Sequence, residues 1–334
     1  MKDNNQSERL TSPEISNLWT HYFRETLSVC VTKYMLRIAH DPEIHNLLQT
    51  ALDLSNQHIR TLKDLFHKEN FPVPNGFTDK DANYDAPPLF SELFCLYYLH
   101  TMTQHGAQSY SLAFSVSIRK DIRDFYYQCN LDTMNLYNQS LELLMTMKCY
   151  VKPPFYELPK KIQYVQNLQY ITDVFGDSRA LNSMEVGNIF FNLEKSRLTK
   201  ALLVAFKQVC KDQAVNKFLD KCIQVKNKHI SIFSTMLLKE NFHTAVTLDT
   251  EITTSTVSPF SDRLITFHSG FLIAAAISYY GTASTASARV DITTSCEKSI
   301  IGNFLVLGSF SKLVIKKGWM EQPPFADDRL KLPE

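Results

Sequence analysis

The sequence predicts an all-α protein made of two tandem four-helix bundles. Glycine is scarce, with 9 residues in 334, and apolar residues recur at helical spacing over long stretches. The two halves of the chain also align with each other, which is the sequence signature of an internal repeat. The length suits two domains of roughly 100–200 residues each. The apolar content of 44% and the charged content of 21% are ordinary for a globular protein.

The internal repeat covers nearly the whole chain. Residues 10–71 align without gaps on residues 181–242, with 14 identities in 62 positions at an offset of 171. After one gap the offset becomes 170, and residues 90–122 align on residues 260–292. The tripeptide Pro-Pro-Phe keeps this register near the end of each copy.

The repeat divides the chain into three parts. We expect a first four-helix bundle over residues 1–155, a linker over 156–180 and a second four-helix bundle over 181–334. The polar first ten residues contain no apolar stretch, so we do not expect a signal peptide. Seven scattered cysteines without a Cys-x-x-Cys pair are typical of reduced thiols.

Each copy is predicted to contain four long helices. In the first copy they are expected from Thr11 or Ser12 to about Ala39, from Pro42 to about Lys68, over about 90–118, and from Asp121 to near Pro153. Glu14 and Glu185 each follow a capping residue by two or three positions, as in a capping box. Asp41 and Asp212 are predicted to cap the second helices, and Asp121 and Asp291 the fourth helices.

The lengths of the connections predict the topology. The first and second helices, and the third and fourth, are joined by short turns and should form antiparallel hairpins. The connection between the hairpins has about 19 residues, which span about 60 Å when extended, whereas a helix of about 27 residues is about 40 Å long. The connection can therefore cross the length of the bundle, which is ferritin-like topology.

Several motifs resemble a known family. The stretches "LTSPEISNLWTHY", "GFTDKDANYDAP", "SPFSDRLITFH" and "GWMEQPPFADDR" resemble an uncharacterised ferritin-like family of unknown function from endospore-forming bacteria. Some single-copy relatives in that family are described as candidate spore-coat proteins. The resemblance implies the fold, a loose association with sporulation and spore-coat proteins as partners; it implies no established activity.

A histidine recurs at the same place in the second helix of each copy. His58 and His229 both lie on the apolar stripe of that helix. Helical register places Glu25 and His105 level with His58, and Glu194 level with His229. The first interpretation is a pair of buried core histidines, each hydrogen-bonded to a polar neighbour.

Metal binding is the alternative interpretation for these five residues. Ferritin-like di-iron sites use one Glu on each of two helices and Glu-x-x-His on the other two. Three residues before the repeated histidines stand Ser55 and Lys226 instead. The sets hold too few carboxylates for a di-iron centre, so no cofactor is predicted. A weak zinc, iron or manganese site remains as the alternative.

Other repeated polar residues suggest a buried network. Asn17, Asn56 and Tyr110 recur as Asn188, Asn227 and Tyr280. The third helices carry no charged residue over 264–288 and 93–118. We expect them to form the contact between the bundles rather than to cross a membrane.

The sequence favours a non-enzymatic function. Neither a phosphate-binding glycine loop nor a catalytic arrangement can be assigned by spacing, so no catalytic residue is predicted. The net charge of +1 does not favour nucleic acid. The main hypothesis is a structural or interaction protein linked to sporulation, located in the cytoplasm or the spore. The alternatives are a metal-binding or oxidoreductase protein with a site near His58 and His105, and a carrier of a small apolar ligand.

Overall fold

The predicted fold class is confirmed. The computed structural model describes residues 9–171 and 179–325. The two ends of the chain and residues 172–178 of the expected linker lie outside the described residues, as does most of the polar N-terminal stretch. Within the described ranges, the secondary structure is helical and includes no strand beyond two isolated bridges.

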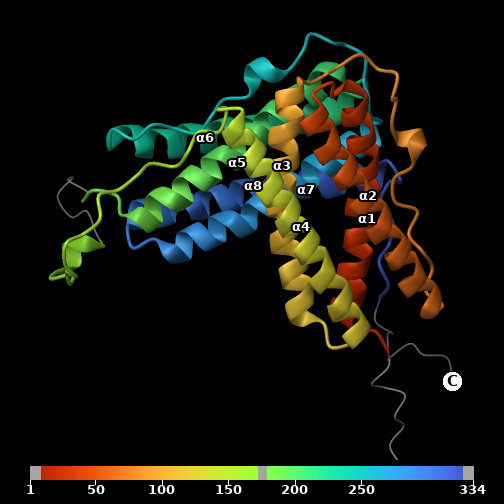
Figure 1. Ribbon diagram of the computed structural model, residues 1–334, viewed down its shortest axis with the longest axis horizontal. Helices are drawn as coiled ribbons and strands as arrows, with labels where there is room; N and C mark the ends of the chain where they lie inside the picture. The colour runs from red at the N-terminus through yellow and green to blue at the C-terminus, as the bar shows by residue number, and fades with distance from the viewer. Residues whose placement is uncertain (1–8, 172–178, 326–334) are drawn as a thin grey trace, which may run out of the picture.

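Each bundle consists of two helical hairpins (Figure 1). The helices of the first bundle are α1 (Ser12–Ile38), α2 (Pro42–Lys68), α3 (Glu92–Val116) and α4 (Lys120–Thr146). Those of the second are α5 (Ser183–Val209), α6 (Gln213–Lys239), α7 (Asp262–Ala286) and α8 (Val290–Lys316). In Figure 1 the first bundle points downward and the second to the left, so that the molecule has two lobes joined at one end.

Capping side chains start the second helix of each bundle as expected. Asp41 Oδ1 accepts hydrogen bonds from the backbone N–H groups of Glu43 and Ile44, at 2.9 and 3.1 Å. Asp212 Oδ1 makes the equivalent contacts at the start of α6, at 2.8 and 3.1 Å. These carboxylates satisfy N–H groups that have no partner within the helix.

The prediction that Asp121 and Asp291 cap the fourth helices is wrong. The capping positions of α4 and α8 are Arg119 and Arg289. Glu14 reaches from α1 and accepts from the N–H groups of residues 118 and 119, at 2.9 and 2.8 Å. Asp121 instead binds the guanidinium of Arg119 at 2.6 Å. The cap comes from a different helix, which helix-end patterns in sequence do not reveal.

The fourth helices end earlier than expected. In α4 the chain leaves the helix after Thr146, and Lys148 adopts a left-handed backbone conformation with φ of 58°. The equivalent position in the second bundle is Gly318, with φ of 65°. A left-handed residue just past a helix closes its last turn, so the helix stops before Pro153.

The crossover segments of the two bundles pair with each other. Ala82 forms an antiparallel bridge with Phe260, and Phe90 forms one with Ile252. At the offset of 170, Ala82 corresponds to Ile252 and Phe90 to Phe260. Each segment therefore presents the same two positions to the other. This is the arrangement of a two-fold symmetric contact, here within one chain.

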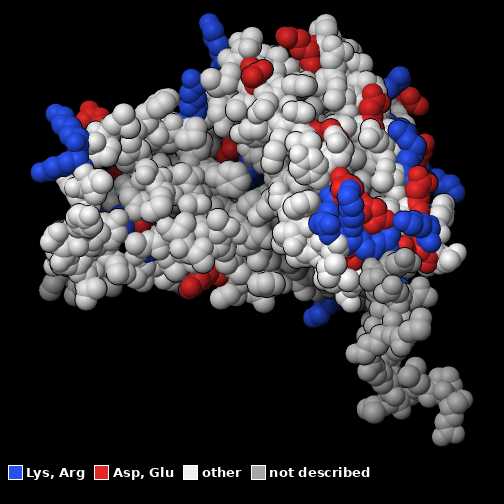
Figure 2. Space-filling model, turned by 60° about the horizontal axis from the view of Figure 1, so that its bottom comes forward, with Lys and Arg blue, Asp and Glu red and all other residues white. Residues whose placement is uncertain are grey.

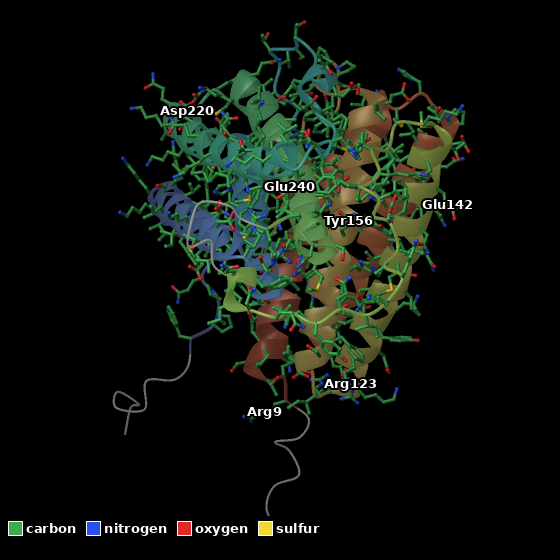
Figure 3. All side chains as sticks on the ribbon, turned by 90° about the vertical axis from the view of Figure 1, so that its left-hand side faces the viewer. Arg9, Arg123, Glu142, Tyr156, Asp220 and Glu240 are labelled. Atoms are coloured by element: carbon green, nitrogen blue, oxygen red, sulfur yellow. The ribbon has the colours of Figure 1, made fainter. Side chains whose placement is uncertain are left out.

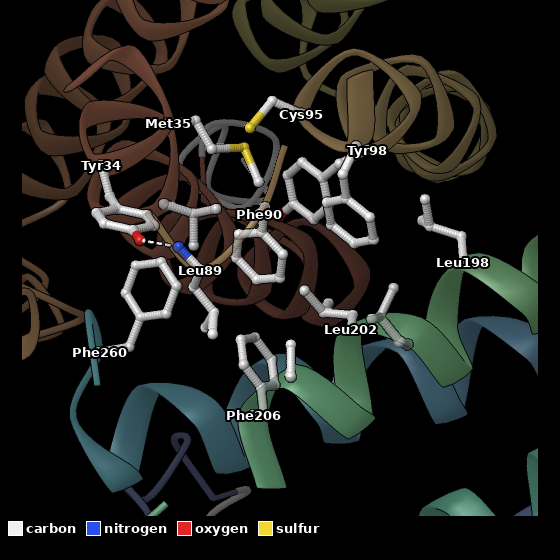
Figure 4. Close-up of a cluster of buried hydrophobic side chains, with 14 of the residues drawn as sticks. Tyr34, Met35, Leu89, Phe90, Cys95, Tyr98, Leu198, Leu202, Phe206 and Phe260 are labelled. Carbon is white, nitrogen blue, oxygen red and sulfur yellow. Dashed lines mark hydrogen bonds between the residues drawn. The ribbon is translucent and has the colours of Figure 1, made fainter. Parts of the chain in front are cut away.

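One apolar core is shared by both bundles. Tyr34, Phe90 and Tyr98 from the first bundle lie in the same cluster as Phe206 and Phe260 from the second (Figure 4). Two smaller clusters fill the outer ends, one in each bundle. The junction is thus the main core of the molecule, and the third helices meet there: Tyr98 Oη of α3 lies 3.1 Å from His268 Nε2 of α7.

The described part of the linker lies on the surface. In Figure 3 it runs across the side of the molecule, past Tyr156. The ring of Tyr156 packs against Phe242, with centroids 5.6 Å apart, and its hydroxyl donates to the carbonyl oxygen of Leu181 at 3.1 Å. These contacts fix part of the linker against the second bundle.

Two helices, α7 and α8, are long and apolar enough to cross a membrane by length and composition alone. In α7, 67% of the most apolar window is buried within the protein, which is typical of a core helix. In α8 the figure is only 28%. The outer face of α8 is therefore apolar and uncovered.

The shared core predicts how the first half behaves alone. A fragment of residues 1–160 would expose the apolar side chains that Phe206 and Phe260 cover in the full chain. We expect this fragment to self-associate and to bind a dye specific for exposed apolar surface, measured by sedimentation velocity and fluorescence. A monodisperse fragment with no more dye binding than the full chain would contradict the shared core.

Candidate functional site

A cavity of about 610 Å³ lies among the helices of the first bundle and α7 of the second. Its walls combine two kinds of side chain. Apolar groups include Leu27, Leu54, Leu99, Met102, Phe271 and Leu272. Titratable groups come from α1, α2, α3 and α7 and comprise His21, Arg24, Glu25, His58, His105, Tyr98, Tyr110 and His268. The volume falls in the range of small-molecule sites, about 300–1,000 Å³.

Glu25 is the buried carboxylate of the cavity. His58 on α2 lies with Nδ1 3.1 Å from Glu25 Oε1, and the hydroxyl of Tyr110 on α3 donates a short hydrogen bond to the same oxygen. All three side chains are buried. The expected closeness of Glu25 and His58 is therefore seen, and three different helices contribute to the group.

The ion pair between Glu25 and His58 shifts both pKa values. Burial alone would raise the pKa of Glu25, but the charge of His58 and the hydrogen bonds from His58 and Tyr110 hold it below its ordinary value. Burial alone would lower the pKa of His58, but the charge of Glu25 and its hydrogen bond raise it. Both shifts favour the ion pair, with an ionised carboxylate on Glu25 and a protonated imidazole on His58, over the neutral forms.

The other histidines of the cavity are neutral. Burial lowers the pKa of His21 to about 3, with a further contribution from Arg24. Burial also lowers the pKa of His268 to about 3. It lowers that of His105 well below its ordinary value, with Lys195 adding to the effect. None of these three has the carboxylate contact that keeps His58 protonated.

Each neutral histidine contacts one tyrosine hydroxyl. His21 Nδ1 lies 3.1 Å from Tyr126 Oη, and His105 Nδ1 lies 2.6 Å from Tyr279 Oη. His268 contacts Tyr98, as described above. The second ring nitrogen of each histidine is buried and has no hydrogen-bond partner among the described residues.

The tyrosine contacts determine which ring nitrogen is protonated. A phenol O–H is a better donor than an imidazole N–H, and an unprotonated imidazole nitrogen is a good acceptor. We therefore assign the phenols as donors. For His105 and His268 the proton then lies on the other, buried nitrogen of the ring. His21 also has a hydrogen bond with the backbone of Asn17, so its tautomer is not fixed by Tyr126 alone.

Arg24 supplies a second positive charge. Its guanidinium lines the cavity and lies 5.7 Å from the centre of the Phe271 ring. Burial lowers its pKa from the ordinary value. Among the described residues, no carboxylate lies within ion-pair distance of Arg24. By contrast, Arg119, Arg179 and Arg263 each contact a carboxylate.

The second bundle contains a changed copy of this site. At the repeat offset, His58 and Tyr110 correspond to His229 and Tyr280. The hydroxyl oxygen of Tyr280 lies 2.9 Å from Nδ1 of His229. Glu25 corresponds to Ser196, which bonds Tyr280 at 3.0 Å. Without a carboxylate beside it, the pKa of His229 falls to about 3, chiefly through burial. The repeated histidine therefore has a raised pKa in the first bundle, where a carboxylate is beside it, and a lowered pKa in the second, where none is.

Arg24, the basic residue next to Glu25, also has a counterpart in the second bundle, but the two basic side chains have different neighbours. Arg24 corresponds to Lys195. The Nζ atom of Lys195 lies 3.4 Å from Glu194 Oε2 and 4.5 Å from the centre of the Phe191 ring. Neither Lys195 nor Glu194 lines the cavity. Lys195 thus has a carboxylate within the protein, whereas Arg24 faces the cavity.

The five predicted metal ligands are only partly brought together. Glu25 and His58 are in contact, while His105 faces Tyr279. In the second bundle His229 contacts Tyr280, and Glu194 contacts Lys195. No group of three or more His, Cys, Asp or Glu residues is arranged to hold a metal ion in the part of the chain that the structure describes. Metal binding at these residues stays a prediction.

The predicted polar network has different members. Tyr110 and Tyr280 join the buried histidines, but Asn17 and Asn188 bond backbone carbonyls one turn earlier on their own helices, each at 2.9 Å. Sequence reasoning missed Arg24, although a basic residue at the same place in both copies was a visible signal. His268 and Tyr279 carried no such signal, because they enter the site from the other bundle.

The family comparison agrees with the internal repeat. A family described as "Protein of unknown function (DUF3231)" matches residues 1–162 and again residues 169–332. None of the curated proteins matches the chain. A crystal structure described as "a putative spore coat protein" from Bacillus halodurans is similar over 46% of this chain and 99% of its own length. The identity is 19% and the TM-score is 0.41.

Removal of the buried carboxylate tests the charge of His58. In Glu25→Gln the burial of His58 is no longer opposed, so we expect its pKa to fall below the ordinary 6.5, where the native protein holds it above. Ring ¹⁵N shifts in an NMR titration measure this. The exposed Glu142→Gln on α4 is the control. An unchanged His58 titration in Glu25→Gln would contradict the ion pair.

The same pair predicts a pH window of stability. The lowered pKa of Glu25 makes its contribution present above about pH 4.5 and lost as pH falls through the folded-state value. The raised pKa of His58 makes its contribution complete below about pH 6.5 and lost as pH rises through the folded-state value. The difference in unfolding free energy between native protein and Glu25→Gln should therefore be largest between these two limits, as measured by urea denaturation.

Proposed function

We propose that this chain, which belongs to the DUF3231 family of unknown function, is a non-enzymatic binding protein for a small organic anion. The ligand would occupy the cavity of the first bundle. The observation that carries the proposal is the Arg24 guanidinium, which faces this cavity without a carboxylate partner among the described residues.

The charges around the cavity favour an anion. Glu25 forms its ion pair with His58, so the positive charge of Arg24 has no ion-pair partner among the described residues. Arg24 is half-buried, and even partial burial of a cation is less costly when an opposite charge accompanies it. A carboxylate on the ligand would supply that charge, and guanidinium groups bind carboxylates through two parallel hydrogen bonds.

The remaining walls describe the rest of the ligand. The N–H groups assigned to His105 and His268 favour a ligand with hydrogen-bond acceptors. The leucines, Met102 and Phe271 favour a hydrocarbon or aromatic body. The ligand class is therefore an amphipathic organic acid. The link to sporulation, the spore-coat partners and the cytoplasmic or spore location stay predictions from the family resemblance.

Matched ligands and variants test the proposal. Decanoate is the anionic probe, and decanamide has the same chain without the charge. We expect decanoate to bind the native protein more tightly than decanamide and to raise its melting temperature. In Arg24→Met, decanoate affinity should fall by about tenfold or more, because a charge-assisted contact is lost. Affinity for decanamide should be nearly unchanged.

The exposed Arg60→Met on α2 is the control, since it removes the same charge from the surface. Isothermal titration calorimetry gives the affinities, and circular dichroism confirms that each variant is folded. Equal binding of decanoate by native protein and Arg24→Met, or equal binding of the two probes by native protein, would refute the role of Arg24.

A further inference from the structure

The outer face of α8 is a continuous apolar surface. Ile301, Phe304, Leu305 and Ile315 are exposed to 59, 58, 72 and 64%. No charged residue occurs from position 299 to position 311. In Figure 2 the second bundle, the left-hand lobe, carries few charged side chains on the face in view. Large contiguous apolar patches on a protein surface usually mark an interaction site.

The exposed residues form one stripe along the helix. Positions 297, 301, 305, 308, 312 and 315 follow each other at three- and four-residue spacing, and position 304, three after 301 and four before 308, lies on the same face. Gly308 lies in this stripe, is exposed, and would have open space around an added Cβ. At one end of the stripe stands the negative Glu297 with the positive Lys298 beside it, and near the other end stands the positive Lys312, all three exposed.

The fold itself does not require this surface. The equivalent positions on α4 of the first bundle are Leu131, Met134, Asn135 and Asn138. Asn135 and Asn138 stand where α8 has Leu305 and Gly308. The same helix in the same type of bundle is therefore polar in its centre in one copy and apolar in the other.

From this pattern we infer that α8 is the contact surface for a second copy of this chain, with the two α8 helices antiparallel. A two-fold axis between Phe304 and Leu305 places Phe304 against the partner's Leu305. It also places Ile301 over the partner's Gly308, where the missing side chain leaves room. Helix packing of this kind brings large side chains into spaces left by small ones.

The charges at the ends of the stripe fit the same axis. Glu297 and Lys312 lie at equal distances along the helix from the point between residues 304 and 305. In the antiparallel arrangement Glu297 faces the partner's Lys312, and Lys312 faces the partner's Glu297. A parallel arrangement in register would instead place like charges together, which is unfavourable.

The exposed area is sufficient for a modest dimer. With roughly 200 Å² for each large apolar side chain, the four exposed fractions leave about 500 Å² on each copy. Two copies would bury about 1,000 Å², near the lower limit of specific interfaces. We therefore expect a dimer that dissociates on dilution rather than a permanent one.

A charge-swap series on the full chain tests the antiparallel dimer. Sedimentation velocity over a range of concentrations should show native protein in a monomer–dimer equilibrium. Glu297→Lys and Lys312→Glu each create two like-charge contacts per dimer, so the dissociation constant should rise by about tenfold or more. The double variant E297K/K312E should restore the native value. Both positions are exposed, so circular dichroism should show unchanged folding.

A matched control lies on α4. Glu142 is the equivalent of Lys312 in the first bundle, and Glu142→Lys should leave the equilibrium unchanged. A native protein that is monomeric at every concentration would overturn the proposal, as would dimers unaffected by both single variants. Binding of the native monomer to phosphatidylglycerol vesicles through Phe304 and Leu305 would also overturn it, in favour of a membrane surface.

Discussion

An ionised carboxylate inside a helical bundle must be neutralised by its neighbours, and this requirement organises the first bundle. Glu25 meets it with a protonated His58 and the hydroxyl of Tyr110. Because this group is balanced internally, the adjacent Arg24 has no anion to bind within the described protein. One buried carboxylate thus explains why His58 alone among the cavity histidines is charged, and why the cavity beside it favours an anion.

The duplicated chain shows how one substitution changes such a site. In the second bundle Ser196 occupies the place of Glu25, and His229 is neutral. The neighbouring cation, Lys195, takes its carboxylate from Glu194 instead. Another cation, Lys226, occupies the place of Ser55 and is buried, which lowers its pKa to about 8. The histidine and tyrosine are kept as part of the packing, whereas the carboxylate that pairs with the histidine is present in the first bundle and is replaced by Ser196 in the second. The two bundles thus share the helices and the buried histidine and tyrosine but differ in the charged residues around them.

The sequence was sufficient for the fold and for part of the site. The repeat and the capping residues predicted four helices in each copy, with bounds in the first copy close to the observed ones except at the end of α4. Helical register placed Glu25 near His58. Register within one bundle is a local property, so the spacing of residues carries it. His268 and Tyr279 were missed because they reach the cavity across the junction, and contacts between bundles leave no periodic pattern in sequence. The cap supplied by Glu14 to α4 was missed because it comes from another helix of the same bundle, and helix-end patterns in the sequence do not reveal such a partner.

The junction gives the cavity its mixed character. The first bundle supplies the charges and much of the apolar wall, and α7 supplies Phe271 and His268 from the other side. Since α7 is held there by the shared core and by the paired crossover segments, the second bundle takes part in the site although its own copy is neutral. The most direct test is a crystal structure of the full chain with decanoate. We predict that the carboxylate of decanoate lies within hydrogen-bond distance of the Arg24 guanidinium and that its hydrocarbon chain packs against Phe271. A structure in which Arg24 is paired with Glu25 and decanoate is absent from the cavity would contradict it.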